Sequence, residues 1–240
     1  LADLVRIAAD SRPRHPAVVT DQRTTSWSEV DWQVRAVAGG LIARGMPPGA
    51  RIGILQRNTL EFVTSYFGIL RAGMVAVPFN TGYTAAELSL MLSDVDVQLV
   101  LADPDVAPVL DGLGVDVIRV GTEDWRRFTV GSAALPVDPT DPESLAVLLF
   151  TSGTTGRPKA AMLTHRALAA NLDQLSALTD PPAMTADDVV LCVLPLFHIY
   201  ALNATLGMAA RHAATIVLTS RFDPLAALAA IGKHRITNVA

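Results

Sequence analysis

The sequence predicts an α/β protein with mostly parallel sheets flanked by helices. Along the chain, short β-rich runs alternate with longer segments in which apolar residues recur at helical spacing. This alternation is typical of parallel strands joined by helical crossovers. Half of the 240 residues are apolar and 18% are charged, a composition that builds a buried core and excludes a disordered chain.

The first long helix is expected to begin at Ser28, which forms an S-x-x-D pattern with Asp31, and to end near Gly45. Its apolar face consists of Val30, Val34, Val37, Leu41 and Ile42. The pair Gly39-Gly40 inside it costs about 1 kcal/mol per glycine relative to alanine. Either close packing or a break in the helix would explain the pair.

The next elements follow in order. Arg51–Leu55 is expected to be a strand, and Asn58 to cap a helix that runs to about Ala72. Thr84 and Glu87 form a T-x-x-E capping box for a helix to about Leu92. Leucines at helical spacing predict another helix over Ala167–Leu178. Further strands are expected at Met74–Pro78, Gln98–Ala102, Val115–Val120, Leu145–Phe150, Ala160–Thr164, Val189–Leu194 and Thr215–Leu218.

These elements suggest two α/β subdomains, over residues 1–120 and 145–240, with a proline-containing acidic connection at 121–144. The second subdomain looks incomplete. Val189–Ala210 lacks charged residues and is long enough to span a bilayer, but Pro195, His198 and Asn203 in its middle argue against a membrane helix. A buried strand followed by a loop and a helix is the better interpretation, so we expect no transmembrane segment.

Composition also bears on partners and location. The chain carries 19 basic and 23 acidic residues, a net charge of −4, which gives no indication of a nucleic acid partner. Cys192 is the single cysteine, so no internal disulfide can form and a reducing, cytoplasmic location is expected. Cys192 and His198 lack partners at a metal-ligand spacing, so no metal site is predicted within the chain. The absence of G-x-S-x-G argues against a serine hydrolase.

The most unusual segment is a Ser/Thr/Gly loop followed by Lys159. It contains Thr151, Ser152, Gly153, Thr154, Thr155 and Gly156. Glycines let backbone N–H groups turn inward, hydroxyls add donors without negative charge, and a lysine can neutralise phosphate. The spacing differs from that of a P-loop, and Pro158 favours a strand–loop–strand arrangement. Composition alone, however, favours a plain flexible turn.

The stretch TSGTTGRPKAAMLTH at 151–165 closely resembles the phosphate-binding signature of the ANL superfamily of adenylate-forming enzymes. LPLFHIYA at 194–201 resembles the second core motif of that superfamily, in the form common among fatty-acyl-CoA ligases. The resemblance implies a partial N-terminal domain of such an enzyme. It places the loop Thr151–Gly156 and Lys159 on the β- and γ-phosphates of ATP, and Phe197, His198 and Tyr200 in the wall of the acyl or adenine pocket. From its residue type alone, His198 would be a core histidine bonded to backbone.

The resemblance further implies an ATP-dependent acyl-CoA synthetase that acts on a carboxylic acid, expected to be a fatty acid, with ATP, Mg²⁺ and coenzyme A. An acyl-carrier protein as the acceptor in place of coenzyme A stays open. The superfamily's Mg²⁺-holding acid and catalytic lysine have no counterparts in this sequence, and Lys233 does not match that lysine in context. We therefore assign no catalytic residue and expect the isolated chain to be inactive. A non-catalytic nucleotide-binding or assembly module remains the alternative, and a homodimer stays open. A phosphatase or kinase would need an acidic metal site near the loop, which the sequence does not show.

Overall fold

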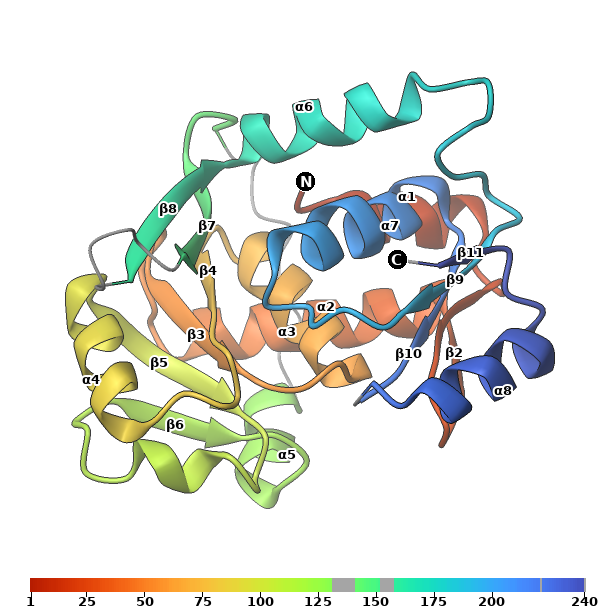
Figure 1. Cartoon of the computed structure of the whole chain (residues 1–240). Helices are drawn as coiled ribbons and strands as arrows, with labels where there is room; N and C mark the ends of the chain where they lie inside the picture. The colour runs from red at the N-terminus through yellow and green to blue at the C-terminus, as the bar shows by residue number, and fades with distance from the viewer. Residues whose placement is uncertain (131–140, 152–157, 221, 240) are drawn as a thin grey trace. The chain divides into compact units, whose positions relative to one another are not determined.

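The computed structural model describes residues 1–130, 141–151, 158–220 and 222–239, and it confirms the α/β class. Two β-sheets are flanked by helices (Figure 1). The chain forms two compact units that alternate along the sequence. Unit 1 comprises Leu1–Gln33, Arg57–Thr64 and Arg166–Ala240, and unit 2 comprises Val34–Gln56 and Ser65–His165.

Unit 2 contains a six-stranded sheet in the order β6-β5-β3-β4-β7-β8. Its neighbouring strands are parallel except for β7 and β8, which are antiparallel. The inner strands are almost wholly apolar and buried, as expected for parallel strands covered on both faces. The strands are β3 (Arg51–Leu55), β4 (Val75–Pro78), β5 (Val97–Ala102), β6 (Asp116–Arg119), β7 (Leu145–Thr151) and β8 (Lys159–Thr164).

Helix α4 (Ala85–Asp94) begins at the predicted capping box. Thr84 Oγ1 accepts a hydrogen bond from the Glu87 N–H at 3.3 Å, and Glu87 Oε2 accepts one from the Thr84 N–H at 2.8 Å. The buried face of α4 joins the core of the sheet through Leu88 and Met91. The other helices in this part of the chain are α2 (Trp27–Ala43), α3 (Leu60–Arg71), η1 (Ala107–Leu110) and α5 (Glu123–Thr129), of which α2 and α3 are divided between the units.

Unit 1 contains a five-stranded sheet in the order β11-β9-β10-β1-β2, parallel except between β1 and β2. Its strands are β1 (Pro16–Val19), β2 (Thr24–Ser26), β9 (Val189–Cys192), β10 (Thr215–Leu218) and β11 (Asn238–Val239). Its further helices are α1 (Leu4–Ser11), α6 (His165–Ser176), the π-helix η2 (Tyr200–Gly207), α7 (Met208–His212) and α8 (Pro224–His234). Helix α1 packs against α7, so the first helix of the chain lies beside an element from its last quarter.

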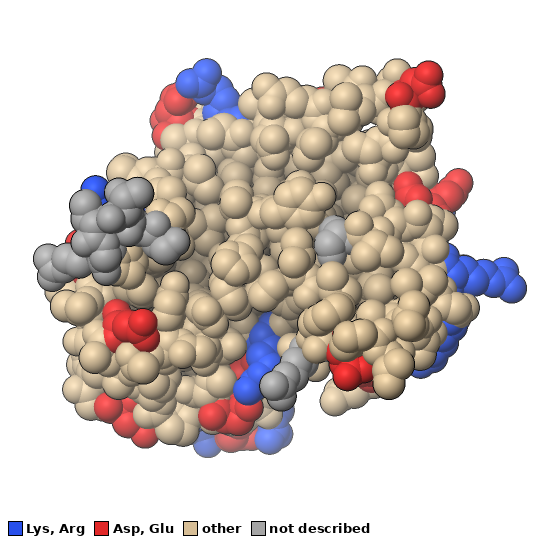
Figure 2. Space-filling model, in the orientation of Figure 1, with Lys and Arg blue, Asp and Glu red and all other residues tan. Residues whose placement is uncertain are grey.

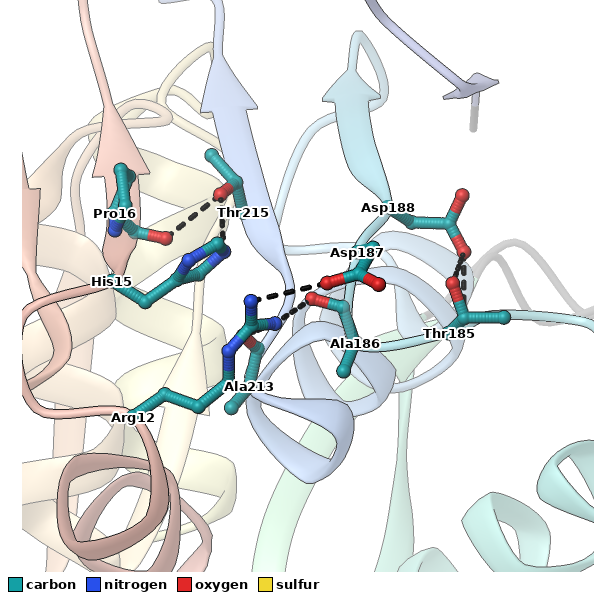
Figure 3. A network of polar contacts seen from close by, with 9 residues as sticks. All are labelled: Arg12, His15, Pro16, Thr185, Ala186, Asp187, Asp188, Ala213 and Thr215. Atoms are coloured by element: carbon teal, nitrogen blue, oxygen red, sulfur yellow. Dashed lines mark hydrogen bonds and ion pairs between the residues drawn. The ribbon is translucent and has the colours of Figure 1, made fainter.

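A polar network ties the start of the chain to later segments of unit 1 (Figure 3). The Arg12 guanidinium donates to the Ala186 carbonyl and pairs with Asp187 at 3.1 Å. The Thr215 hydroxyl donates to the Pro16 carbonyl at 2.8 Å. The bond between Thr215 and Pro16 joins the first residues of β10 and β1, so it supports the pairing of those two strands.

The two units do not coincide with the expected segments 1–120 and 145–240. Strand β7 belongs to unit 2 because Val147 pairs with Ala76 of β4. Strand β1 belongs to unit 1 because Val18 pairs with Ile216 of β10. Strand pairing across long separations, rather than order along the chain, therefore determines the units.

The segment 121–144, expected to be a surface connection, contains the helix α5. Phe128 of α5 is buried against α2. A Cβ on Gly40 would lie 2.3 Å from the Phe128 carbonyl oxygen, and α2 continues through Gly40 without a break. Close packing therefore explains that glycine. Residues 131–140 of the connection lie outside the described residues.

Two predicted helix starts were also wrong by one or two residues. Helix α2 is capped by Ser26 and Glu29: the Ser26 N–H donates to Glu29 Oε2 at 2.7 Å, and the Glu29 N–H donates to Ser26 Oγ at 3.4 Å. At α3, Thr59 Oγ1 accepts from the Phe62 N–H at 3.2 Å, in place of the cap expected at Asn58. Asn58 bonds elsewhere, as described below.

In the part of the chain that the structure describes, no helix is long and apolar enough to cross a membrane. The uncharged stretch Val189–Ala210 is divided among β9, η2 and α7. Cys192 is a free, buried thiol. Burial raises the pKa of Cys192 to about 12.

Candidate functional site

Strands β7 and β8 hold the two ends of the predicted phosphate loop. Thr151 is the last residue of β7 and lies opposite Lys159, the first residue of β8. The Thr151 hydroxyl donates to the Lys159 carbonyl at 3.4 Å, and both residues are exposed. The strand–loop–strand arrangement is thereby confirmed for its two strands. The other predicted loop residues, Ser152, Gly153, Thr154, Thr155 and Gly156, lie outside the described residues.

The position of Thr151 in the sheet is the one at which α/β proteins bind ligands. Strand β7 runs parallel to β4, so its last residue lies at the carboxyl edge of the parallel strands. In open α/β sheets, ligands bind beyond this edge. The buried residues Ala146 and Val147, both 0% exposed, anchor β7 in the core, so Thr151 is presented from a rigid strand.

Lys159 also lines an open groove of about 390 Å³ within unit 2. The charged residues of its lining are Arg51, Asp94 and Lys159, and Leu148 and Met162 are among the apolar ones. With two cations and one carboxylate, this lining carries a net positive charge, which is compatible with an anionic ligand.

The second motif follows β9 directly. Leu196 is fully buried, Phe197 is half-buried and His198 is exposed. The rings of Phe197 and His198 are in contact, with centroids 4.5 Å apart and an interplanar angle of 48°. The exposure of His198 rules out the interpretation of a core histidine. The backbone N–H of His198 donates to the Pro195 carbonyl at 3.0 Å, which closes the turn before η2.

Asn58 fixes this motif from a distant part of the chain. Its side-chain Nδ2 donates to the Leu194 carbonyl at 2.9 Å, and its Oδ1 accepts from the Leu196 N–H at 2.8 Å. Asn58 is 8% exposed. One buried amide thus satisfies two backbone groups on either side of Pro195, which restrains the segment that carries Phe197 and His198.

The π-helix η2 begins at Tyr200, which is 58% exposed. Asn203 anchors η2 to α6, because its Nδ2 donates to the Leu168 carbonyl at 3.2 Å and to Asn171 Oδ1 at 2.9 Å. π-helical segments are rare in proteins, and those that occur often lie at functional sites. Figure 2 shows that the surface over α6 and α7 is formed mainly by uncharged side chains.

A cavity of about 110 Å³ lies beside η2 within unit 1. Its lining includes Tyr200, Thr205 and Met208. Thr205 is 0% exposed, and its hydroxyl oxygen has no hydrogen-bond partner. Of the predicted pocket residues, Tyr200 therefore lines a cavity, whereas Phe197 and His198 contact each other outside its lining.

Among the residues that the structure describes, no group of three or more His, Cys, Asp or Glu side chains could hold a metal ion. The Mg²⁺ that the sequence resemblance implies therefore has no fitting set of ligands here, and we assign it none.

The fold, the strand–loop–strand and the motif after β9 together correspond to a known class of nucleotide-dependent enzymes. The sequence matches the AMP-binding enzyme family over residues 5–240, and the chain belongs to that family. It is 34% identical over 223 residues to 4-coumarate–CoA ligase 5 of Oryza sativa subsp. japonica, covering 89% of this chain and 41% of that protein. The chain thus spans less than half the length of this relative.

Several solved structures show the same fold. ATP-bound MatB from Rhodopseudomonas palustris is 29% identical with a TM-score of 0.86, covering 99% of this chain and 48% of that one. The inhibitor-bound N-terminal domain of FACL13 from Mycobacterium tuberculosis is 26% identical with a TM-score of 0.90, covering 99% and 61%. A fatty acyl CoA synthetase of the same bacterium is 25% identical with a TM-score of 0.89, covering 99% and 48%.

The roles of two residues in these sites, Asn58 and Thr205, were not predicted from the sequence. Asn58 was predicted as a helix cap, and its contacts to Leu194 and Leu196 lie more than 130 positions away. Thr205 lies in an apolar run without a motif of its own. The signal for Asn58 was an amide three residues after a buried strand, which is also the pattern of a helix cap.

Proposed function

We propose that this chain is the N-terminal part of an ATP-dependent ligase that joins a carboxylic acid to coenzyme A. The match to the AMP-binding enzyme family over residues 5–240 carries this proposal. The paired ends of the loop at Thr151 and Lys159, at the carboxyl edge of the parallel strands, support it from the structure.

The proposed reaction has two steps. In the first, a carboxylate oxygen of the acid attacks the α-phosphorus of ATP, the bond to the β-phosphate oxygen breaks, and pyrophosphate leaves. In the second, the thiol sulfur of coenzyme A attacks the acyl carbon, the thiol proton is released, and AMP leaves. The carboxylate is already ionised at neutral pH, so the first step needs no general base in this chain.

In this proposal, the residues of this chain act by position and charge. The loop Thr151–Gly156 holds the β- and γ-phosphates with hydroxyl and backbone N–H donors, and Lys159 balances their charge. Preorganised donors of this kind stabilise the charge that pyrophosphate carries away. Phe197, His198 and Tyr200 form a wall of the acyl or adenine pocket, and Asn58 holds the backbone that carries the first two.

The sequence predicts a fatty acid as the substrate. The fatty acyl CoA synthetase among the similar structures supports that choice, whereas the relative named for 4-coumarate supports an aromatic acid. The expected use of Mg²⁺, a cytoplasmic location and a homodimer remain parts of the proposal that rest on the sequence alone.

The decisive experiment is acid-dependent exchange of radioactive pyrophosphate into ATP by the protein that contains this chain. We expect exchange that requires an added acid. ATP binding in calorimetry without any exchange, over a broad panel of acids, would favour the alternative of a non-catalytic nucleotide-binding module. For residues 1–240 alone we expect weak or no turnover. Robust thioester formation by that chain would contradict the expectation that it lacks the catalytic residues.

A further inference from the structure

A serine hydroxyl and an imidazole meet where the end of α6 lies against the end of α7. Ser176 is the last residue of α6, and its Oγ lies 3.0 Å from Nε2 of His212, the last residue of α7. Both residues belong to unit 1, and both are half-buried, so solvent reaches the pair. A hydroxyl within about 2.6–3.2 Å of a base has the geometry of an activated nucleophile.

The hydroxyl proton of Ser176 is directed at the imidazole. The Arg211 Nε–H donates to Ser176 Oγ at 3.1 Å, so the oxygen acts as an acceptor on that side. The hydroxyl has one proton of its own, and two acceptors lie within reach: His212 Nε2 at 3.0 Å and Met208 Sδ at 3.8 Å. A thioether is a weak acceptor, and this one is also further away. The proton therefore goes to Nε2 of His212.

His212 is in the protonation state that can accept this proton. Burial lowers the pKa of His212 below its usual 6.5, and the charge of Arg211 lowers it further, while the charge of Asp188 acts in the opposite direction. The imidazole is therefore neutral at pH 7.5. Once the ring takes up a proton, the charge of Asp188 and the position of the ring at the C-terminus of α7 stabilise it.

Arg211 supports the serine oxygen as that oxygen loses its proton. Its Nη2 pairs with Asp173 Oδ1 at 2.6 Å, while its Nε–H bonds to Ser176. The guanidinium is thus held in place with its positive charge beside Oγ, where it stabilises developing negative charge. Arg211 and Asp173 are exposed, so a small reactant can approach Ser176 from this side.

A second hydroxyl–imidazole pair in unit 1 lacks this geometry. Thr215 Oγ1 lies 3.3 Å from Nε2 of His15, but its hydroxyl donates to the Pro16 carbonyl at 2.8 Å (Figure 3). Thr215 is also buried, at 5% exposure. Burial lowers the pKa of His15 as well, so the two imidazoles are alike in that respect. The direction of the hydroxyl proton and the access of solvent distinguish Ser176 from Thr215.

We propose that Ser176 is a nucleophile that accepts the acyl group of small activated esters, with His212 as its base. Ser176 Oγ bonds to the acyl carbon while its proton passes to His212 Nε2. The bond from that carbon to the alcohol oxygen breaks, and the alcohol leaves with the proton from His212. Water then attacks the acyl-serine, again with His212 as the base, and the acid is released. The absence of G-x-S-x-G is compatible with this activity, because Ser176 lies at a helix end instead of a strand-to-helix turn.

The test treats the protein that contains this chain with p-nitrophenyl acetate, in the absence of ATP and coenzyme A. We expect a burst of p-nitrophenolate, the sign of an acyl-enzyme, and an acetyl ester on Ser176 in mass spectrometry. Neutral hydroxylamine should remove this ester and leave acetylated amines intact. Ser176→Ala should abolish both signals. In His212→Gln the new side chain can still bond to the hydroxyl but cannot take up its proton, so the ester should form at least about 100-fold more slowly.

Two variants serve as matched controls. His15→Gln changes the imidazole beside Thr215, and Ser28→Ala removes an exposed hydroxyl that lies 3.3 Å from the hydroxyl of Ser26. Both should leave the acetylation rate of Ser176 unchanged. Thermal melts check that each variant folds. If His212→Gln does not fold, Arg211→Gln decides the question, since it keeps the base, removes the guanidinium and should slow acetylation at least about tenfold.

The absence of an ester on Ser176, an equal rate of its formation in folded His212→Gln, or an equal loss in His15→Gln would each overturn the proposal. The reaction uses neither ATP nor coenzyme A, so it does not rest on the proposed ligase. Failure of pyrophosphate exchange would leave this proposal standing, and failure of acetylation would leave the ligase standing.

Discussion

Asn58 Oδ1 accepts a hydrogen bond of 2.8 Å from the backbone N–H of Leu196, a residue 138 positions later in the chain. With the second bond, from Nδ2 to the Leu194 carbonyl, the amide binds both polar groups of one turn of backbone. The turn contains Pro195, which has no N–H of its own, so an outside side chain supplies the restraint that regular secondary structure gives elsewhere.

Asn58→Ala should therefore lower the free energy of unfolding by about 2 kcal/mol, since it leaves the buried N–H of Leu196 and the partly buried carbonyl of Leu194 without their partner. Urea unfolding measures this change. Asn80→Ala is the control, because Asn80 Oδ1 accepts from the Gly82 N–H in an exposed turn, and it should cost less than about 1 kcal/mol. Equal effects of the two substitutions would show that the Asn58 contacts do not restrain the motif.

Lys159→Ala should reduce pyrophosphate exchange at least about tenfold and leave stability nearly unchanged, because the side chain is exposed and its proposed partner is a phosphate. Lys233→Ala supplies the control, as Lys233 is the other lysine of the sequence and lies exposed near the end of α8. Exchange rates and thermal melts of both variants give the comparison. Normal exchange in Lys159→Ala would remove this residue from the mechanism.

Gly40→Ala should destabilise the protein by about 1–3 kcal/mol even though alanine favours helix by about 1 kcal/mol over glycine. The new Cβ would meet the backbone of Phe128 at 2.3 Å, and backbone cannot move aside as a side-chain tip can. Gly232→Ala, in α8 with nothing within 4 Å, should stabilise by about 0.5–1 kcal/mol. Chemical denaturation of the two variants should give changes of opposite sign, and a shared sign would contradict the packing argument.

Because the pKa of His165 is lowered, we expect the protein to lose stability in mild acid. Burial lowers the pKa of His165 to about 4, from its usual 6.5, and its Nε2 has no partner among the described residues. The unfolded chain therefore takes up this proton first as the pH falls. The contribution of neutral His165 to the free energy of unfolding is complete above pH 6.5. It is lost between about pH 6.5 and pH 4, with a slope of up to about 1.4 kcal/mol per pH unit.

The comparison of the protein with His165→Gln isolates this contribution, because His15 and His212 also have lowered pKa values and remain in both. The free energies of unfolding of the protein and of His165→Gln, measured at pH 7.5, 6, 5 and 4.5, should converge or cross as the pH falls. Parallel curves would mean that His165 titrates alike in the folded and unfolded chains.

Cys192 should resist thiol reagents while the protein is folded. The side chain is 0% exposed and the pKa of its thiol is raised by burial to about 12, so both access and thiolate content are low at pH 8. We expect reaction with Ellman's reagent at least about 100-fold slower than in guanidinium chloride. Fast labelling of the native protein would show that the sheet around β9 opens readily.

Much of the fold could be predicted because it depends on local patterns. The strands Arg51–Leu55 and Thr215–Leu218 have the predicted bounds, and the Thr84–Glu87 capping box is present. Each depends on residues within one element, where apolar spacing or an i to i+3 contact is decisive. The error at α2 is also local, because Ser26 and Ser28 both start a capping pattern, and the cap that forms uses the longer glutamate side chain of Glu29.

What the sequence could not provide depends on contacts between distant segments. The partners of Asn58, the close approach of Phe128 to Gly40 and the division into units arise only when strands pair across the chain. At the candidate phosphate loop, the strands that Pro158 led us to expect are present, and each extends one residue further than predicted, to Thr151 and from Lys159. The role of these two residues towards phosphate stays a prediction. The cavity was not predicted, since its wall comes from five helices and strands and one loop between Leu175 and Asn238.

The pairing of Val18 with Ile216 has a consequence for how the protein is made. On a ribosome that adds about 5–20 residues per second, β10 follows β1 by roughly 10–40 s. During that interval β1 lacks its neighbour β10. Strands β3 to β8 all lie between residues 51 and 164, so their neighbouring strands have already been synthesised. During synthesis β1 therefore has only β2 as a neighbour until β10 emerges, and its open edge is where a chaperone would be needed.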